Sequence, residues 1–171
     1  MSMMFPKHHP MYASHLESVE LARQEGDLHH LEMLEEDIRP IVEMLEEAWQ
    51  RIRAACQVDV ANLIGIELRN ERIDQWAAIL ADPSEPGRYR AQYYAANGFH
   101  GHATYDSLEE VLCELLQEGF RQLAGGAMQT LSQTKSWADG MFYAELIRKV
   151  NCGQLSYAEA NREYEHYRQA C

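Results

Sequence analysis

Two histidines separated by one glycine are the residues best placed to perform chemistry in this chain. In His100-Gly101-His102 the imidazoles are two positions apart, and on a β-strand residues i and i+2 face the same side. Two such side chains could chelate one metal ion, with Asp106 close enough to complete the site. A zinc site needs three or four ligands, however, and no H-E-x-x-H or C-x-x-C motif supplies the others. We therefore interpret the histidines as structural or surface residues, with a small metal-dependent enzyme as an open alternative.

The chain offers little for covalent catalysis. A nucleophile needs a neighbouring base and an orienting acid, whereas Cys113 and Ser136 occupy ordinary core and cap positions. No nucleophile elbow and no phosphate-binding glycine loop is present. The four cysteines are far apart in the sequence and form no C-x-x-C pair, which is typical of a reducing compartment. We expect no enzyme activity, no metal and no cofactor.

A run of carboxylates carries most of the net charge. The 171 residues have a formal charge of −12. Between Glu25 and Glu47 there are nine acidic residues and only one arginine. Because apolar residues fill the inward side of this helical segment, the carboxylates must gather on its outward sides. Such a row could imitate DNA phosphates or bind a basic protein, or it could only keep the protein soluble. The acidic contact residues that we predict are Glu32, Glu35, Glu36, Asp37, Glu43, Glu46 and Glu47.

A second candidate surface combines cations with aromatic rings. Arg88 and Arg90 lie among tyrosines that include Tyr94, and His100 and His102 follow after a turn. We predict that these five residues contact a partner. An acidic chain with a pI of about 5.0 is poorly suited to nucleic-acid backbones or anionic membranes, because both attract positive surfaces. We therefore expect a protein partner, with a basic nucleic-acid-binding protein and a homodimer as open alternatives.

The elements that must position these residues are mostly helices. Ser14 begins a capping box for a short helix that ends at Gly26. A longer stripe of apolar residues at steps of three or four predicts a second helix, with Pro40 as a kink or a restart. Its inward residues are Leu28, Leu31, Leu34, Ile38, Ile41, Leu45, Trp49 and Ile52. A third helix is predicted over Val60–Ala81, with Leu63, Ile66, Ile73, Trp76 and Leu80 inward.

Two prolines and a glycine within 82–87 predict a subdomain boundary. Beyond it, residues 88–95 and 99–105 predict a β-hairpin around an Asn97-Gly98 turn. A helix capped by Ser107 and two later helices follow, around Trp137–Val150 and from Ser156. The predicted fold class is α+β and mainly α. It combines N-terminal antiparallel helices with a β-hairpin packed with C-terminal helices. The expected parts are a flexible N-terminus at 1–13, an acidic helical region at 14–82 and a hairpin-plus-helices unit at 88–171.

A stretch after the boundary resembles a known family. It contains an aromatic strand, the sequence Gly98-Phe99-His100-Gly101-His102, the helix start Thr104-Tyr105-Asp106-Ser107 and a closing Gly119-Phe120. Over roughly 88–123 it is similar to the KfrB-like accessory domain of plasmids and integrative elements. Trp137, Gly140 and the pattern Asn151-x-Gly153-x-Leu155-Ser156 extend the likeness to about residue 160. The resemblance implies an accessory module of plasmid maintenance, transfer or conflict with the host, without a chemistry assigned to particular residues.

The sequence as a whole predicts a non-catalytic interaction protein of a mobile element, with an acidic inhibitor of host defence or a DNA mimic as the alternative. No apolar run approaches the roughly 18 residues that a membrane span requires. The first twelve residues also lack the apolar stretch of a signal peptide. We therefore expect a cytoplasmic location.

Overall fold

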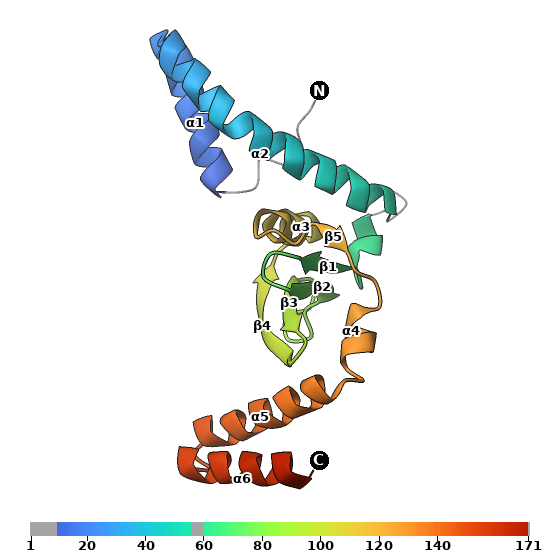
Figure 1. Ribbon diagram of the computed structural model, residues 1–171. Helices are drawn as coiled ribbons and strands as arrows, with labels where there is room; N and C mark the ends of the chain where they lie inside the picture. The colour runs from blue at the N-terminus through green and yellow to red at the C-terminus, as the bar shows by residue number, and fades with distance from the viewer. Residues whose placement is uncertain (1–9, 56–59, 171) are drawn as a thin grey trace.

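The protein has an α+β fold built around one antiparallel sheet. The computed structural model describes residues 10–55 and 60–170. It is 57% helical and 19% strand, with five strands in the sheet. Figure 1 shows the sheet between two groups of helices, one formed by the N-terminal part of the chain and one by the C-terminal part. No helix among the described residues is long and apolar enough to cross a membrane.

Most strands pair with their neighbours in the sequence. The sheet order is β4-β3-β2-β1-β5, so the first four strands form a meander and β5 returns to pair with β1. The elements in chain order are α1 (Pro10–Glu25), α2 (Leu28–Ala55), η2 (Val60–Leu63), β1 (Glu67–Asn70), β2 (Gln75–Ala81), β3 (Tyr89–Ala95), β4 (Gly98–Tyr105), α3 (Leu108–Gln117), β5 (Gln122–Leu123), α4 (Ala127–Leu131), α5 (Lys135–Asn151) and α6 (Tyr157–Ala170).

One face of the sheet carries the main hydrophobic core. Alternate strand residues such as Leu68 and Ile79 are fully buried there, against Leu112 and Leu116 of α3. The C-terminal half of α2 adds Trp49 and other residues to the same cluster. We call this side of the sheet the α3 face. The apolar stripe of α2 is therefore core in its C-terminal half.

The opposite face is covered by the chain that follows β5. Ala78 and Tyr94 are buried there together with Trp137 of α5, and residues of α4 pack against them. Glu67 ties these parts together, because its Oε2 accepts hydrogen bonds from the Tyr94 hydroxyl and the Met128 backbone N–H, both at 2.9 Å. We call this side the α4 face.

The predicted helix over Val60–Ala81 is wrong, because half of this segment forms the strands β1 and β2. Both faces of these strands are covered, so β2 is a nearly continuous apolar run that does not alternate. The turn between them contains no glycine or proline, and Asp74 supplies the positive φ of +50°. Leu63 is buried as expected, but Ile73 is exposed in that turn.

The predicted boundary at 82–87 is the loop between two strands that pair with each other in the sheet. These residues connect β2 to β3, which pair along their whole length from Trp76–Tyr94 to Ala81–Tyr89. The structure therefore joins the end of the expected 14–82 region to the expected 88–171 unit. Of the expected flexible N-terminus, residues 1–9 lie outside the described residues, and α1 already begins at Pro10.

The β-hairpin at Tyr89–Tyr105 is confirmed, but its turn is one residue earlier than predicted. Ala96 and Asn97 form the turn, and Gly98 is already the first residue of β4. Of these three residues, only Gly98 has a positive φ, at +112°. A β-bulge shifts the register between Tyr93 and Tyr94. The bulge changes which face each histidine occupies.

The helix caps beyond the hairpin are confirmed. Ser107 Oγ accepts the backbone N–H of Glu110 at 3.1 Å, and Glu159 Oε2 accepts both donors of Ser156. In the N-terminal region α2 runs through Pro40 without ending there. Leu28 and Ile41, predicted to point inward, are exposed instead. The side chain of Ile38 lies outside what the structure describes.

Candidate interaction surfaces

The carboxylates of α2 divide into two groups. Glu35 lies on the side of α2 that faces α1, where its Oε1 accepts a hydrogen bond from Arg23 Nη2 at 3.0 Å. Glu46 is half-buried. The other five residues are exposed and form what we call the outer face of α2: Glu32, Glu36, Asp37, Glu43 and Glu47. Helical spacing places Glu32, Glu36, Glu43 and Glu47 opposite the buried Leu45 and Trp49, whereas Asp37 lies on the flank of the helix.

Apolar side chains stand beside these carboxylates. Met33 is 53% exposed, Ile41 is 50% exposed and Met44 is 37% exposed. Helical spacing places Met33 and Met44 close together at the side of the acidic row, and Ile41 one turn after Asp37 on the flank toward Leu45. Met44 Sδ also accepts a hydrogen bond from Arg121 Nη1 at 3.2 Å. Sequence reasoning missed this feature because it assigned Ile41 to the core and treated the outward side as purely charged. The outer face is therefore a mixed acidic and apolar surface.

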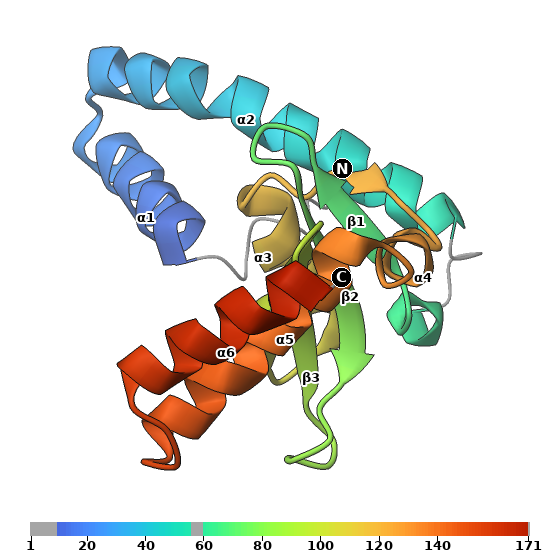
Figure 2. The same cartoon turned by 60° about the horizontal axis from the view of Figure 1, so that its bottom comes forward.

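The α1–α2 hairpin holds this face away from the sheet. Val19 and Ala22 of α1 are buried, and Val42 of α2 is buried as well. Figure 2 shows α1 beside the first half of α2, well apart from the strands, while the second half of α2 crosses the sheet unit. The first half of α2 is thus covered on one side only, which leaves Glu32, Glu36 and Asp37 open, while Glu43 and Glu47 are exposed on the second half.

The cations and aromatic rings of β3 do not form one surface. Successive strand residues point to opposite faces, so Tyr89 and Tyr93 contact the main core on the α3 face, while Tyr94 lies on the α4 face. Tyr94 is 0% exposed, so it cannot contact a partner as predicted. Its phenol pKa is raised, first by burial and then by the hydrogen bond to Glu67.

Of the two arginines, Arg88 is held by carboxylates, whereas Arg90 acts on one only through its charge. Arg88 Nη1 lies 2.8 Å from Glu85 Oε2, and Arg88 Nε lies 2.9 Å from Asp106 Oδ1. The Glu85 hydrogen bond is the main cause that raises the pKa of Arg88. Arg90 is half-buried, and its charge is one of the smaller causes that lower the pKa of Asp82, after the Ser84 backbone hydrogen bond. Arg88 therefore ties the β2–β3 connection to the end of β4.

His100 and His102 are both exposed, but they are not a chelating pair. His102 pairs with Gln92 in the regular part of the ladder, whereas His100 lies at the β-bulge. His100 lines a groove on the α3 face, and its Nε2 is 3.1 Å from Asn97 Oδ1. The prediction that both rings share a face fails because the bulge breaks the two-residue alternation between them. No group of three or more candidate ligands occurs within the described residues.

The tip of the hairpin is packed against α5. Trp137 makes edge-to-face contacts with Tyr94 and Phe99, with ring centroids 6.0 and 5.1 Å apart. A Cβ on Gly140 would overlap the Asn97 carbonyl group, so only glycine allows α5 to come this close. The tip is therefore a structural joint between β4 and α5.

The described cysteines give no sign of reactivity. Cys113 is buried in the main core, and burial is the main cause that raises its thiol pKa to about 12. Cys152 is free and exposed. Cys56 and Cys171 lie outside the described residues. A raised thiol pKa leaves the thiolate scarce at neutral pH, so Cys113 is a poor nucleophile.

Comparison with known proteins adds no relative to this description. No family model, curated protein or solved structure matches the chain. The candidate surfaces therefore stand on their geometry.

Proposed function

We propose that this chain is a non-catalytic interaction module that binds a basic protein through the outer face of α2. One observation carries the proposal, namely five exposed carboxylates standing beside exposed Met33, Ile41 and Met44 on one helix. Carboxylates attract and orient a positive partner, while apolar contacts supply binding free energy that salt does not screen. Methionine side chains adapt to partners of different shape.

The charge density favours protein docking over imitation of DNA. Residues 32 and 47 are about 23 Å apart along a helix axis that rises about 1.5 Å per residue. The five outer carboxylates therefore supply about one charge per 5 Å, whereas duplex DNA carries one per about 1.7 Å. A DNA-binding cleft would meet less than half of the charge it is built for. The apolar residues have no counterpart in a phosphate backbone.

We further propose that this module serves a plasmid or an integrative element. The support is the resemblance of residues 88–123 to KfrB-like accessory domains. Two residues that extend the likeness, Trp137 and Gly140, contact the hairpin that carries it. On this proposal, partition or regulatory proteins of the element and basic host proteins are the partner classes.

Capture from cytosol stripped of nucleic acid tests the role of the α2 face. The test variant reverses four outer residues, Glu36→Lys, Asp37→Lys, Glu43→Lys and Glu47→Lys. A control variant with the same change in net charge reverses four exposed glutamates elsewhere, Glu17→Lys, Glu71→Lys, Glu163→Lys and Glu165→Lys. Surface changes of this kind alter stability by no more than about 0.5 kcal/mol each, so both variants should fold.

We expect proteins that the wild type and the control variant retain and that the test variant loses. Their capture should weaken with added salt but persist in part, because the apolar contacts remain. Equal loss from both variants would mean that only net charge matters, and equal retention would mean that the outer face does not bind. If duplex DNA abolishes capture completely, the DNA mimic replaces the proposed docking mode.

A further inference from the structure

One edge of the sheet is open. β4 is the last strand in the sheet order, and within the described chain its only strand partner is β3. The stretch from Phe99 to His102 is exposed, and a Cβ on Gly101 would have no neighbour within 4 Å. An edge strand presents unpaired N–H and C=O groups, which another extended chain can pair with.

A groove runs up to this edge on the α3 face. It has a volume of about 430 Å³ and lies where the C-terminal end of α3 leaves the sheet uncovered. Tyr93 and Phe120, whose ring centroids are 5.7 Å apart, form its aromatic part. Gly101 keeps the end beside β4 open, and Glu118 supplies a carboxylate. The groove thus offers an apolar floor with a negative charge at its side.

Two further glutamates, Glu110 and Glu114, extend this negative charge along α3 toward the end of β4. Glu110, Glu114 and Glu118 are four residues apart, so they lie on one side of the helix or its last turn. Glu110 Oε2 accepts the Asp106 backbone N–H at 3.1 Å, just after β4 ends. Glu118 Oε2 accepts the Tyr93 hydroxyl at 2.8 Å, at the other end of the groove. The row therefore begins beside the end of β4 at Glu110 and crosses toward β3, where Glu118 contacts Tyr93.

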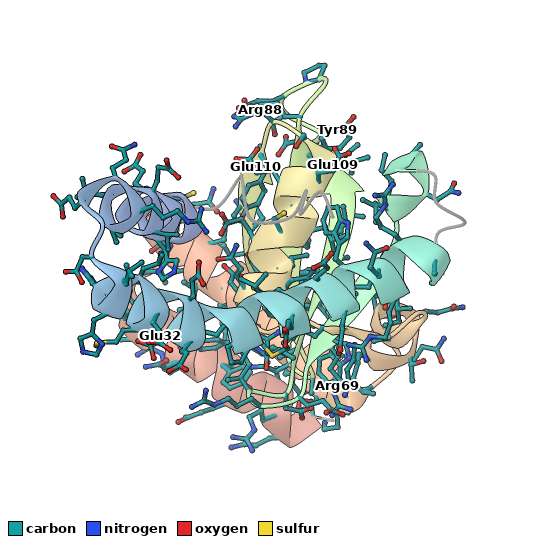
Figure 3. All side chains as sticks on the ribbon, turned by 90° about the horizontal axis from the view of Figure 1, so that it is seen from above. Glu32, Arg69, Arg88, Tyr89, Glu109 and Glu110 are labelled. Atoms are coloured by element: carbon teal, nitrogen blue, oxygen red, sulfur yellow. The ribbon has the colours of Figure 1, made fainter. Side chains whose placement is uncertain are left out.

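The surroundings of Tyr105 agree with this placement. Burial is the first cause that raises its phenol pKa, and the charges of Glu118, Glu114 and Glu110 all contribute. All three carboxylates therefore lie within electrostatic reach of the Tyr105 hydroxyl. Figure 3 shows Glu109 and Glu110 at one end of α3, beside Arg88 and Tyr89 of the hairpin. At the other end, Asn70 Nδ2 donates to the Glu118 carbonyl oxygen at 2.8 Å and holds that residue in place.

We propose that the β4 edge binds an extended segment of a partner protein in which every second residue is lysine or arginine. The segment adds to the sheet as a strand beside β4. Its basic side chains face the glutamate row, and the aliphatic stem of one of them lies in the groove over Tyr93 and Phe120. This surface is separate from the outer face of α2, so it goes beyond the proposed function and can fail independently of it.

The spacing of the glutamate row argues for this occupant. Residues four apart on a helix are separated by about 6 Å along the axis. Residues two apart on a strand lie on the same face and are separated by about 6.6 Å. Alternate side chains of an added strand therefore repeat at nearly the same interval as the glutamates. A basic helix laid on the same row would match the charges but leave the β4 backbone unpaired.

Peptide binding distinguishes strand addition from simple charge attraction. The probes are fluorescein-labelled eight-residue peptides that alternate Lys with Thr, or Glu with Thr, measured by anisotropy against the full chain. Two further Lys–Thr peptides carry N-methyl groups, one on the Lys amides and one on the Thr amides. Only one set of amides points toward β4. We expect the Lys–Thr peptide to bind, the Glu–Thr peptide not to bind, and one methylated peptide to lose about tenfold or more.

Two pairs of variants locate the binding site. Gly101→Phe fills the groove, and Gly125→Phe is its control, because neither glycine has a positive φ or a near neighbour. Glu114→Gln with Glu118→Gln removes charge from the row, and Glu163→Gln with Glu165→Gln removes the same charge from α6. We expect each test variant to weaken the Lys–Thr peptide about tenfold or more and each control to leave it unchanged.

Several results would overturn the proposal. Equal binding of both methylated peptides would mean that no strand is added. Unchanged affinity in Gly101→Phe would place the peptide elsewhere, and if that variant fails to fold, unchanged affinity in the Glu114/Glu118 variant decides in the same way. A wild-type dimer that Gly101→Phe converts to a monomer, with no binding of the Lys–Thr peptide, would assign the edge to a second copy of this chain.

Discussion

The α1–α2 hairpin and the sheet unit differ in how they bury their apolar side chains. The sheet unit is packed on both faces, with Leu116 and Tyr94 each 0% exposed in separate clusters. The free half of the α1–α2 hairpin buries little beyond Val19, Ala22 and Val42 and exposes several apolar residues. The sheet unit therefore determines the fold, whereas substitutions on the outer face of α2 should cost little stability.

The joint between the hairpin tip and α5 should give the largest effect. Replacing a helical glycine by alanine normally stabilises a protein by about 0.5–1 kcal/mol. Gly140→Ala should instead destabilise by about 3 kcal/mol or more, because its Cβ would overlap the Asn97 carbonyl group. Chemical denaturation measures both values, with Gly125→Ala as the control in open space. A stabilised Gly140→Ala variant would show that α5 does not pack on the hairpin.

Matched leucine truncations test the comparison itself. Leu116→Ala removes a fully buried side chain of the main core and should cost about 2–5 kcal/mol of unfolding free energy. Leu21→Ala removes a side chain of α1 that is 55% exposed and should cost no more than about 0.5 kcal/mol. Thermal or urea unfolding of the two variants gives the difference. Similar losses would mean that the α1–α2 hairpin contributes as much to stability as the sheet unit.

Local signals in the sequence predicted the elements on the far side of residue 87 well. The capping boxes at Ser107 and Ser156 and the glycine-bearing turn act through neighbouring residues, so a sequence reveals them without knowledge of the fold. The strands β1 and β2 could not be recognised in the same way, because two-sided burial removes their alternation. Which layers cover a strand is a property of the whole fold.

The candidate surfaces were predictable only where charge alone defines them. The acidic residues of α2 are visible in the sequence, but the exposure of Ile41 depends on where α1 and α3 pack. The burial of Tyr94 depends on α4 and α5, which begin more than thirty residues after Tyr94. The β-bulge that separates His100 from His102 breaks the alternation on which the chelation argument relied.

Removing one hydroxyl tests whether the hairpin is scaffold. Tyr94→Phe leaves the ring in the core but takes away the donor to Glu67, so the half-buried carboxylate keeps only the Met128 N–H. A hydrogen bond to a charged group contributes about 1.5–3 kcal/mol, and we expect a loss in that range. Tyr143→Phe, at an exposed position of α5, is the control and should change little. An unchanged melting temperature in Tyr94→Phe would mean that the hydrogen bond to Glu67 does not stabilise the fold.

The smallest expected effect is a pH dependence at the start of α6. Hydrogen bonds from Ser156 lower the pKa of Glu159 below its ordinary value of 4.5. A lowered folded-state pKa stabilises the cap above the ordinary value, and that contribution is lost as pH falls through the lowered value. Circular dichroism should therefore show α6 fraying at acid pH. Glu159→Gln should remove this part of the titration, and an unchanged titration would contradict it.

Carboxylate footprinting of the chain with its captured partner tests directly whether the outer face of α2 is the docking surface. Carbodiimide-coupled labelling with glycine ethyl ester, read by mass spectrometry, reports the accessibility of each carboxylate in the free chain and in the complex. We expect Glu36, Asp37, Glu43 and Glu47 to lose labelling in the complex, while the exposed Glu163 and Glu165 keep it. Unchanged labelling of the α2 residues in a complex that protects other carboxylates would contradict the assignment of the α2 outer face as the docking surface.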